Sequence, residues 1–145
     1  MPKFKFDLQK VLNVRSIRED IARNEFFQAR KEKEVIEKQL QQLNFVQNDI
    51  CNFIKNEKLD LYQMIQARDY LHNNRLKIKQ TKQQLHKKKK DVFEKKEQLI
   101  ERRKNRQVLD NLKDKKEKEH YREMIAREQK EIDEVAVNYY AGGLS

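Results

Sequence analysis

The side chains best able to do chemistry in this sequence are three histidines, one cysteine and many carboxylates. His72, His86 and His120 lie far apart and match no metal-binding spacing, so a metal site is not expected. Gly142 and Gly143 stand at the end of the chain, where they cannot build a phosphate-binding loop. Acid-base catalysis needs an enclosed pocket around its carboxylates, which paired helices do not provide. We therefore expect no enzyme and no catalytic, cofactor-binding or metal-binding residues.

The strongest remaining signal of function is a run of positive charge. Residues 75–118 carry 18 Lys and Arg against 7 Asp and Glu, a net charge of +11, whereas the whole chain carries +10. Such a stripe is either a solvated helix face or a surface for an acidic partner. Phosphate contacts with a nucleic acid would use the same residue types.

Composition predicts long helices with few loops to position these residues. The 145 residues are 40% charged and 37% hydrophobic, with only two Gly and one Pro. Low hydrophobicity with high net charge is also typical of disorder, but the apolar residues recur at helical intervals. Cys51 is the lone cysteine, which favours a reducing compartment such as the cytosol and excludes an intrachain disulfide. No signal peptide or membrane-spanning segment is expected.

The first half of the chain has the spacing of a coiled-coil seam. Alternate steps of four and three residues from Leu8 to Ile54 meet ten apolar residues at fourteen positions, where composition predicts about five. The same steps from Met64 give an apolar column that ends at Leu99 and a basic column. We expect the apolar column to be buried and the basic side chains to extend to water. The basic column is Arg68, Arg75, Lys82, Lys89 and Lys96.

Beyond Leu99 the next apolar residues are Val108, Leu109 and Leu112, which predicts a change of register. A further seam begins at Tyr121 and continues to Tyr139. The end of the second helix beyond Leu109 would have to be single, folded back or covered by a partner.

The fold class predicted by these patterns is all-α, a long antiparallel two-helix coiled coil, or helical hairpin, whose second helix is the longer. We expect helix one at about 5–56, a turn at about 57–60, helix two at about 61–139 and a flexible tail at 140–145. Asp60 with Gln63 resembles a capping box that would start helix two. The alternative turn is His72 to Asn74, where two Asn could leave the helical region.

Three segments in order resemble the FliJ family, the small stalk protein of the bacterial flagellar type III export ATPase. They are Phe4 to Arg15, with its basic Phe pair and Leu-rich continuation; Glu101 to Lys113, similar to the family's Glu-Arg and Leu-rich segment; and Arg127 to Ala136, similar to its Glu-Gln-Lys-rich close. The resemblance runs from end to end of the chain. The family is similar to the antiparallel coiled coil of the rotary ATPase central stalk.

The resemblance implies a non-enzymatic protein of flagellum assembly and protein export that inserts into the pore of the hexameric export ATPase and stimulates it. It further implies contact with the export gate protein FlhA, handling of export chaperones, and a cytoplasmic location at the inner face of the membrane. The family's gate-contacting run maps to Gln39, Leu43, Val46 and Ile50, with Tyr70 as a continuation on helix two. The ATPase would meet the basic residues Lys88, Lys89, Lys90, Arg102, Arg103 and Arg106.

Two other functions fit the same residues. An RNA-binding coiled-coil arm would place the basic face on phosphates, although aromatic residues are not interleaved with the cations. A generic coiled-coil scaffold would use only the helices.

Overall fold

The computed structural model describes residues 3–56 and 58–143 and contains two helices, α1 (Gln9–Ile54) and α2 (Leu61–Gly143). These ranges contain no strand. Helix α1 has 46 residues and α2 has 83, so the prediction of an all-α hairpin with a longer second helix is confirmed. Neither helix has a stretch apolar enough to cross a bilayer within the part of the chain that the structure describes.

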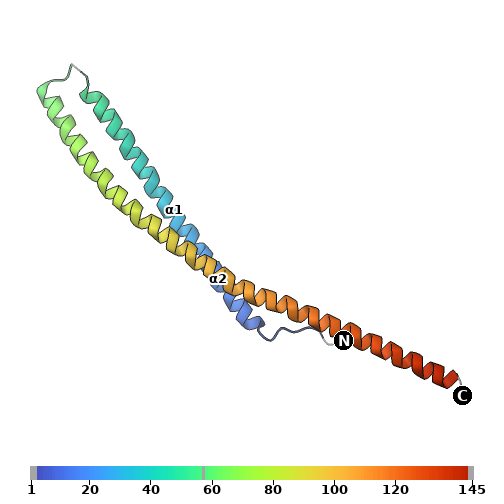
Figure 1. Cartoon of the computed structure of the whole chain (residues 1–145). Helices are drawn as coiled ribbons and strands as arrows, with labels where there is room; N and C mark the ends of the chain where they lie inside the picture. Colours follow the sequence, from blue (N-terminus) through green and yellow to red (C-terminus); the bar gives the residue numbers. More distant parts are fainter. Residues whose placement is uncertain (1–2, 57, 144–145) are drawn as a thin grey trace. The chain divides into compact units, whose positions relative to one another are not determined.

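The contacts divide the chain into two units. The middle unit, Asp20–Ile100, contains the turn and the parts of α1 and α2 that run antiparallel, side by side (Figure 1). The terminal unit combines Met1–Glu19 with Glu101–Ser145. In the terminal unit, Leu12 and Leu109 are buried, and the Phe4 ring lies 5.6 Å from the His120 ring.

The α1 seam lies where its spacing predicts. Of the fourteen positions, only Leu8 is exposed, and the other thirteen are buried or half-buried. Three of the buried positions hold Glu19, Ala22 and Ala29, which are small or polar. Small side chains let the two helices approach closely, and a buried carboxylate needs a charged partner.

Both α2 columns behave as predicted. The apolar column from Met64 to Leu99 is buried or half-buried, and the basic column beside it is exposed to water. A second seam column was not predicted. The second seam column lies three residues, instead of four, after each apolar position from Met64 to Val92, whereas Arg102, three residues after Leu99, is exposed. Its side chains can meet α1: Ala67 and Thr81 are small, Asn74 donates a hydrogen bond to α1, and the two Lys form ion pairs with α1 carboxylates. This column is Ala67, Asn74, Thr81, Lys88 and Lys95.

The predicted change of register directly after Leu99 is wrong. Arg106 lies one heptad beyond Leu99 and is half-buried, and Leu109 continues the second column. The predicted seam followed apolar residues only, so it did not include the charged residue Arg106, through which the seam continues. The first column continues unchanged at Lys113 and His120. The spacing changes in the second column, where the half-buried residues Glu117 and Met124 lie four residues after these positions instead of three.

The capping box is confirmed at the start of α2. The Gln63 backbone N–H donates to Asp60 Oδ1 at 2.7 Å, and the Asp60 N–H donates to Gln63 Oε1 at 3.2 Å. The alternative turn at His72 to Asn74 is excluded, since these residues lie inside α2. Asn74 is buried there, and its Nδ2 donates to the Leu43 carbonyl oxygen at 3.0 Å.

The helix ends differ from the expected bounds. Helix α1 begins at Gln9 instead of residue 5, because residues 3–8 leave the helical path and place Phe4 against His120. Helix α2 continues to Gly143 instead of ending at 139, so the expected tail is helical at residues 140–143. No glycine within residues 3–56 and 58–143 has a positive φ. Residues 144–145 of that tail lie outside the described ranges.

Candidate functional site

An apolar groove lies between α1 and α2 near the turn of the middle unit. Three residues predicted to meet the export gate, Val46, Ile50 and Tyr70, line it together. Ile50 is buried at its base, whereas Tyr70 is 56% exposed. Phe53 also lines the groove and is 48% exposed, but it was missing from the predicted site. Its position one heptad beyond Val46 was the signal that could have found it.

The other two predicted gate residues do not line this groove. Gln39 is exposed one heptad before Val46, on the same side of α1. Leu43 is a half-buried seam residue whose carbonyl oxygen accepts the Asn74 hydrogen bond. The structure therefore joins part of the predicted site and assigns Leu43 to the contact between the helices.

The predicted ATPase-binding cations fall into two groups. Lys89, Lys90 and Arg102 are exposed, and none of them forms an ion pair among the described residues. Lys88, Arg103 and Arg106 instead form ion pairs with carboxylates of α1. Three of the six predicted ATPase-binding cations therefore form ion pairs within the chain itself.

In the middle unit, Lys88 Nζ lies 2.7 Å from Glu32 Oε2. This hydrogen bond lowers the pKa of the Glu32 carboxyl, with a smaller contribution from Gln28, and raises the pKa of Lys88. Lys95 Nζ lies 3.6 Å from Glu25 Oε2, one heptad along. Both pairs reach solvent, so each stabilises the helix contact only slightly.

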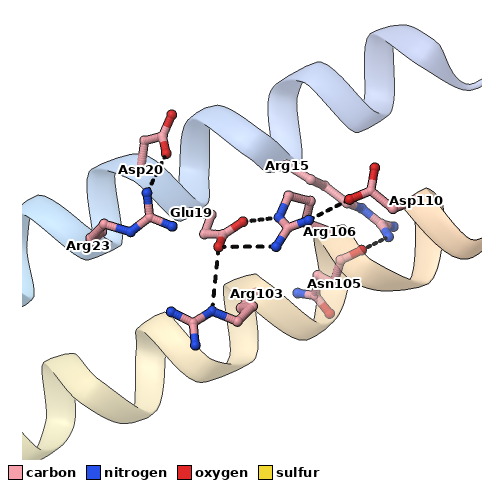
Figure 2. Close-up of polar contacts among 8 residues, drawn as sticks. All are labelled: Arg15, Glu19, Asp20, Arg23, Arg103, Asn105, Arg106 and Asp110. Carbon is pink, nitrogen blue, oxygen red and sulfur yellow. Dashed lines mark hydrogen bonds and ion pairs between the residues drawn. The ribbon is translucent and has the colours of Figure 1, made fainter.

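A more buried cluster lies in the terminal unit (Figure 2). Glu19 is only 2% exposed, and its carboxylate accepts hydrogen bonds from Arg106 Nε and from Arg106 Nη2, the latter at 3.5 Å. Arg103 Nε lies 3.6 Å from Glu19 Oε1. The buried carboxylate is therefore flanked by two guanidinium groups of α2.

Two further contacts complete the cluster. Arg106 Nη1 donates to Asp110, and the hydrogen bonds to Glu19 and Asp110 together raise the pKa of Arg106. Arg15 Nη1 donates to the Asn105 carbonyl oxygen at 2.9 Å (Figure 2). Sequence spacing placed Glu19 in the seam but could not supply its partner, because that partner lies 87 residues away.

The last part of α2 has an uncovered apolar face. Every residue from 125 to 142 is exposed. The residues predicted to form the final seam include Ile125, Ile132 and Val135, which are 62–67% exposed. These side chains have the spacing of a helix contact but no helix covers them within the described part of the terminal unit.

The titratable residues considered for chemistry do not converge. No group of three His, Cys, Asp or Glu is arranged to hold a metal ion within residues 3–56 and 58–143. Cys51 is a half-buried free thiol. The groups whose pKa is shifted, Glu32, Lys88 and Arg106, owe the shift to ion pairs between side chains.

The two helices form a helical hairpin with exposed apolar and basic surfaces. The solved structure of a candidate YscO homologue from Chlamydia trachomatis has the same fold, with a TM-score of 0.56 over 92% of this chain and 93% of that chain, at 18% sequence identity. No curated protein matches the sequence. The family model described as Flagellar FliJ protein matches residues 4–145, and this chain therefore belongs to the FliJ family.

Proposed function

We propose that this member of the flagellar export apparatus is a non-enzymatic stalk that binds the hexameric export ATPase, stimulates it and couples it to the export gate protein FlhA. Family membership supports the general role in flagellar export. The observation that carries the finer proposal is the uncovered, heptad-spaced face of α2 from Tyr121 to Tyr139, next to exposed cations. A helix with such a face needs a partner, because apolar residues repeated at this spacing are otherwise left in water.

In this proposal the ATPase contacts α2, through its exposed cations and through the uncovered face from Tyr121 to Tyr139. Lys89, Lys90 and Arg102 supply exposed positive charge for acidic loops of the ring. Lys88, Arg103 and Arg106 act indirectly, by holding α1 and α2 together through Glu32 and Glu19. Charge on α2 would mainly raise the rate of association, whereas the apolar face would lengthen the lifetime of the complex.

The gate contact is assigned to the groove at the turn. Phe53 and Tyr70 offer exposed aromatic surface on two different helices, and Val46 and Ile50 form the apolar base between them. Aromatic side chains around an apolar depression are typical of strong binding positions in protein interfaces. Gln39 extends the same side of α1 by one heptad.

Three associated roles belong to the same proposal. The chain would work at the inner face of the cell membrane through its partners, would escort export chaperones, and would hydrolyse nothing itself. In support of a non-enzymatic role, the shifted pKa values of Glu32, Lys88 and Arg106 are explained by ion pairs and need no catalytic pocket.

The direct test is ATP hydrolysis by the cognate export ATPase, titrated with the full chain while ring formation is followed by light scattering. We expect stimulation that saturates near one chain per hexamer. The variant Ile125→Ser with Ile132→Ser should reduce stimulation strongly, whereas Phe45→Ser, also at an exposed apolar residue but in the middle unit, should not. Absence of both binding and stimulation by the unmodified chain would refute the proposal.

A further inference from the structure

The two sides of the helix pair in the middle unit differ in charge. On one side, the Lys88–Glu32 and Lys95–Glu25 pairs join the flanks of α1 and α2. Asn74 and the apolar groove lie on this same side, because Ala67, Asn74, Lys88 and Lys95 occupy one heptad column. Positive charge on this side is therefore matched by carboxylates.

The opposite side of α2 carries the column predicted to flank the seam, which we call the basic flank: Arg68, Arg75, Lys82, Lys89 and Lys96. All five side chains are exposed, and the structure gives none of them an ion pair among the described residues. The next column outward, from His72 to Ile100, contains no carboxylate either. At about 1.5 Å per residue, the basic flank places a cation about every 10.5 Å over about 42 Å.

Helix α1 adds little negative charge on this side. Glu25 and Glu32 occupy the α1 column on the ion-paired side of the seam. The α1 column on the other side of the seam contains Arg23, Arg30 and Glu37. Arg23 pairs with Asp20, and Glu37 pairs with Lys33 on its own helix. Arg30 is exposed and lies over the Phe26 ring at 5.7 Å. With Asp20 and Glu34 in its next column outward, α1 is close to neutral on this side, so the positive charge of this side comes from α2.

Phe93 is an exposed aromatic residue set within this positive surface. It is 63% exposed and lies four residues after Lys89 and three before Lys96, so it is a neighbour of both on the helix surface. One exposed aromatic beside a line of cations suits the interfacial region of a membrane, where the ring enters the headgroup layer and the cations meet lipid phosphates. Stacking of successive bases would require several aromatic residues along the line.

We propose that the basic flank binds a surface of anionic phospholipid. Laterally mobile lipid headgroups can match a line of cations at any spacing. Phosphates of a folded nucleic acid are instead fixed on a curved surface. This inference does not depend on the ATPase or gate contacts, because the lipid is bound by the chain alone.

The test measures flotation of the full chain with vesicles of phosphatidylglycerol and phosphatidylcholine, and with vesicles of phosphatidylcholine alone. We expect binding only to the anionic vesicles, and weaker binding as salt increases. The triple variant Arg75→Glu, Lys82→Glu, Lys89→Glu should lower the partition coefficient at least about tenfold. The matched control, Lys77→Glu, Lys87→Glu, Lys90→Glu, makes the same charge change on other faces of α2 and should have a much smaller effect.

A second variant separates lipid insertion from charge. Phe93→Ala should weaken vesicle binding several-fold without altering its dependence on salt, and circular dichroism should show unchanged helicity in every variant. Equal loss in the two triple variants, no effect of Phe93→Ala, or no binding to anionic vesicles would each overturn the proposal. So would displacement from the vesicles by equimolar single-stranded or duplex RNA, which would assign the basic flank to nucleic acid.

Discussion

Glu19 and Arg106 form an ion pair across the helix contact of the terminal unit, with the carboxylate almost fully buried and the guanidinium group partly exposed (Figure 2). The two residues differ in their access to water. Side-chain exposure is 3% for Glu19 and 27% for Arg106. Arg106 also has Asp110 as a second partner, and Glu19 has Arg103.

This asymmetry predicts unequal effects of removing either partner. Arg106→Leu should destabilise the fold by about 2–3 kcal/mol, because it removes the guanidinium group that donates two hydrogen bonds to a buried carboxylate. Glu19→Leu should cost about 1 kcal/mol, since Arg106 can reach water and Asp110. The double variant should recover most of the lost stability. Urea unfolding of the four proteins measures the cycle, and equal costs for the two single variants would contradict the asymmetry.

The buried Asn74 should stabilise the middle unit through its hydrogen bond to Leu43. Asn74→Ala should lower the free energy of unfolding by about 1 kcal/mol, because one part-buried hydrogen bond is lost. The neighbouring exposed Asn73 provides the control, and Asn73→Ala should leave stability within about 0.5 kcal/mol. Denaturant unfolding checks both variants. A larger loss for Asn73→Ala would show that the hydrogen bond is not the relevant interaction.

The Lys88–Glu32 pair should stabilise the fold only over a limited range of pH. The lowered pKa of Glu32 means that its contribution is present above the ordinary value of 4.5 and is lost as pH falls through the folded-state value. The raised pKa of Lys88 means that its contribution is present below 10.5 and is lost as pH rises through the folded-state value. Glu32→Gln should therefore lower Tm slightly between these limits and not at strongly acidic pH.

Melting curves across the pH range measure this window. Glu34→Gln is a suitable control, because Glu34 is exposed and forms no ion pair among the described residues. A Tm difference for Glu32→Gln that persists undiminished in strong acid would exclude the ion pair as its source.

The capping box should determine how well α2 begins after the turn. Asp60→Ala removes the acceptor for the Gln63 N–H and should cost about 1 kcal/mol. Asp60→Asn retains an acceptor at the same position and should cost much less. Thermal unfolding followed at 222 nm distinguishes them, and similar melting of the two variants would contradict a capping role.

The proposed gate contact predicts which aromatic residues of the groove should matter for binding to FlhA. Phe53→Ala and Tyr70→Ala should each weaken binding to FlhA by about tenfold or more, with little change in stability, because both side chains are about half exposed. Phe45→Ala is the control, since Phe45 is 67% exposed and does not line the groove. Calorimetric titration measures the affinities. A larger loss for Phe45→Ala would move the contact away from the groove.

The sequence contained enough information to predict the fold class and the α1 seam, because both depend on local spacing. It also placed the start of α2, where Asp60 and Gln63 act within a few residues. The second α2 column was missed because Ala67 is its only apolar residue, and the burial of Asn74 and Lys88 depends on which side of α2 faces α1. The partners of Glu19 and Lys88 could not be predicted for the same reason, since their pairing follows from the alignment of two distant segments.

The candidate surfaces were predicted less completely than the fold. Val46, Ile50 and Tyr70 do meet in one groove, whereas Leu43 belongs to the seam. Exposed and ion-paired cations look identical in the sequence, so Arg102 could not be separated from Arg103 and Arg106.

The exposed end of α2 should open, and exchange its amide protons, on a faster timescale than the rest of the helix. Residues 125–142 bury no side chain, so their helix is held only by its own backbone hydrogen bonds and local side-chain pairs. Such a segment opens without disturbing the packed seams, and its amide protons should exchange with solvent far faster than those beside Leu99 or Ile78. Binding of this segment to a partner would then slow amide exchange over a continuous stretch of backbone. The largest change in exchange on binding is therefore expected in the segment that exchanges fastest in the free chain.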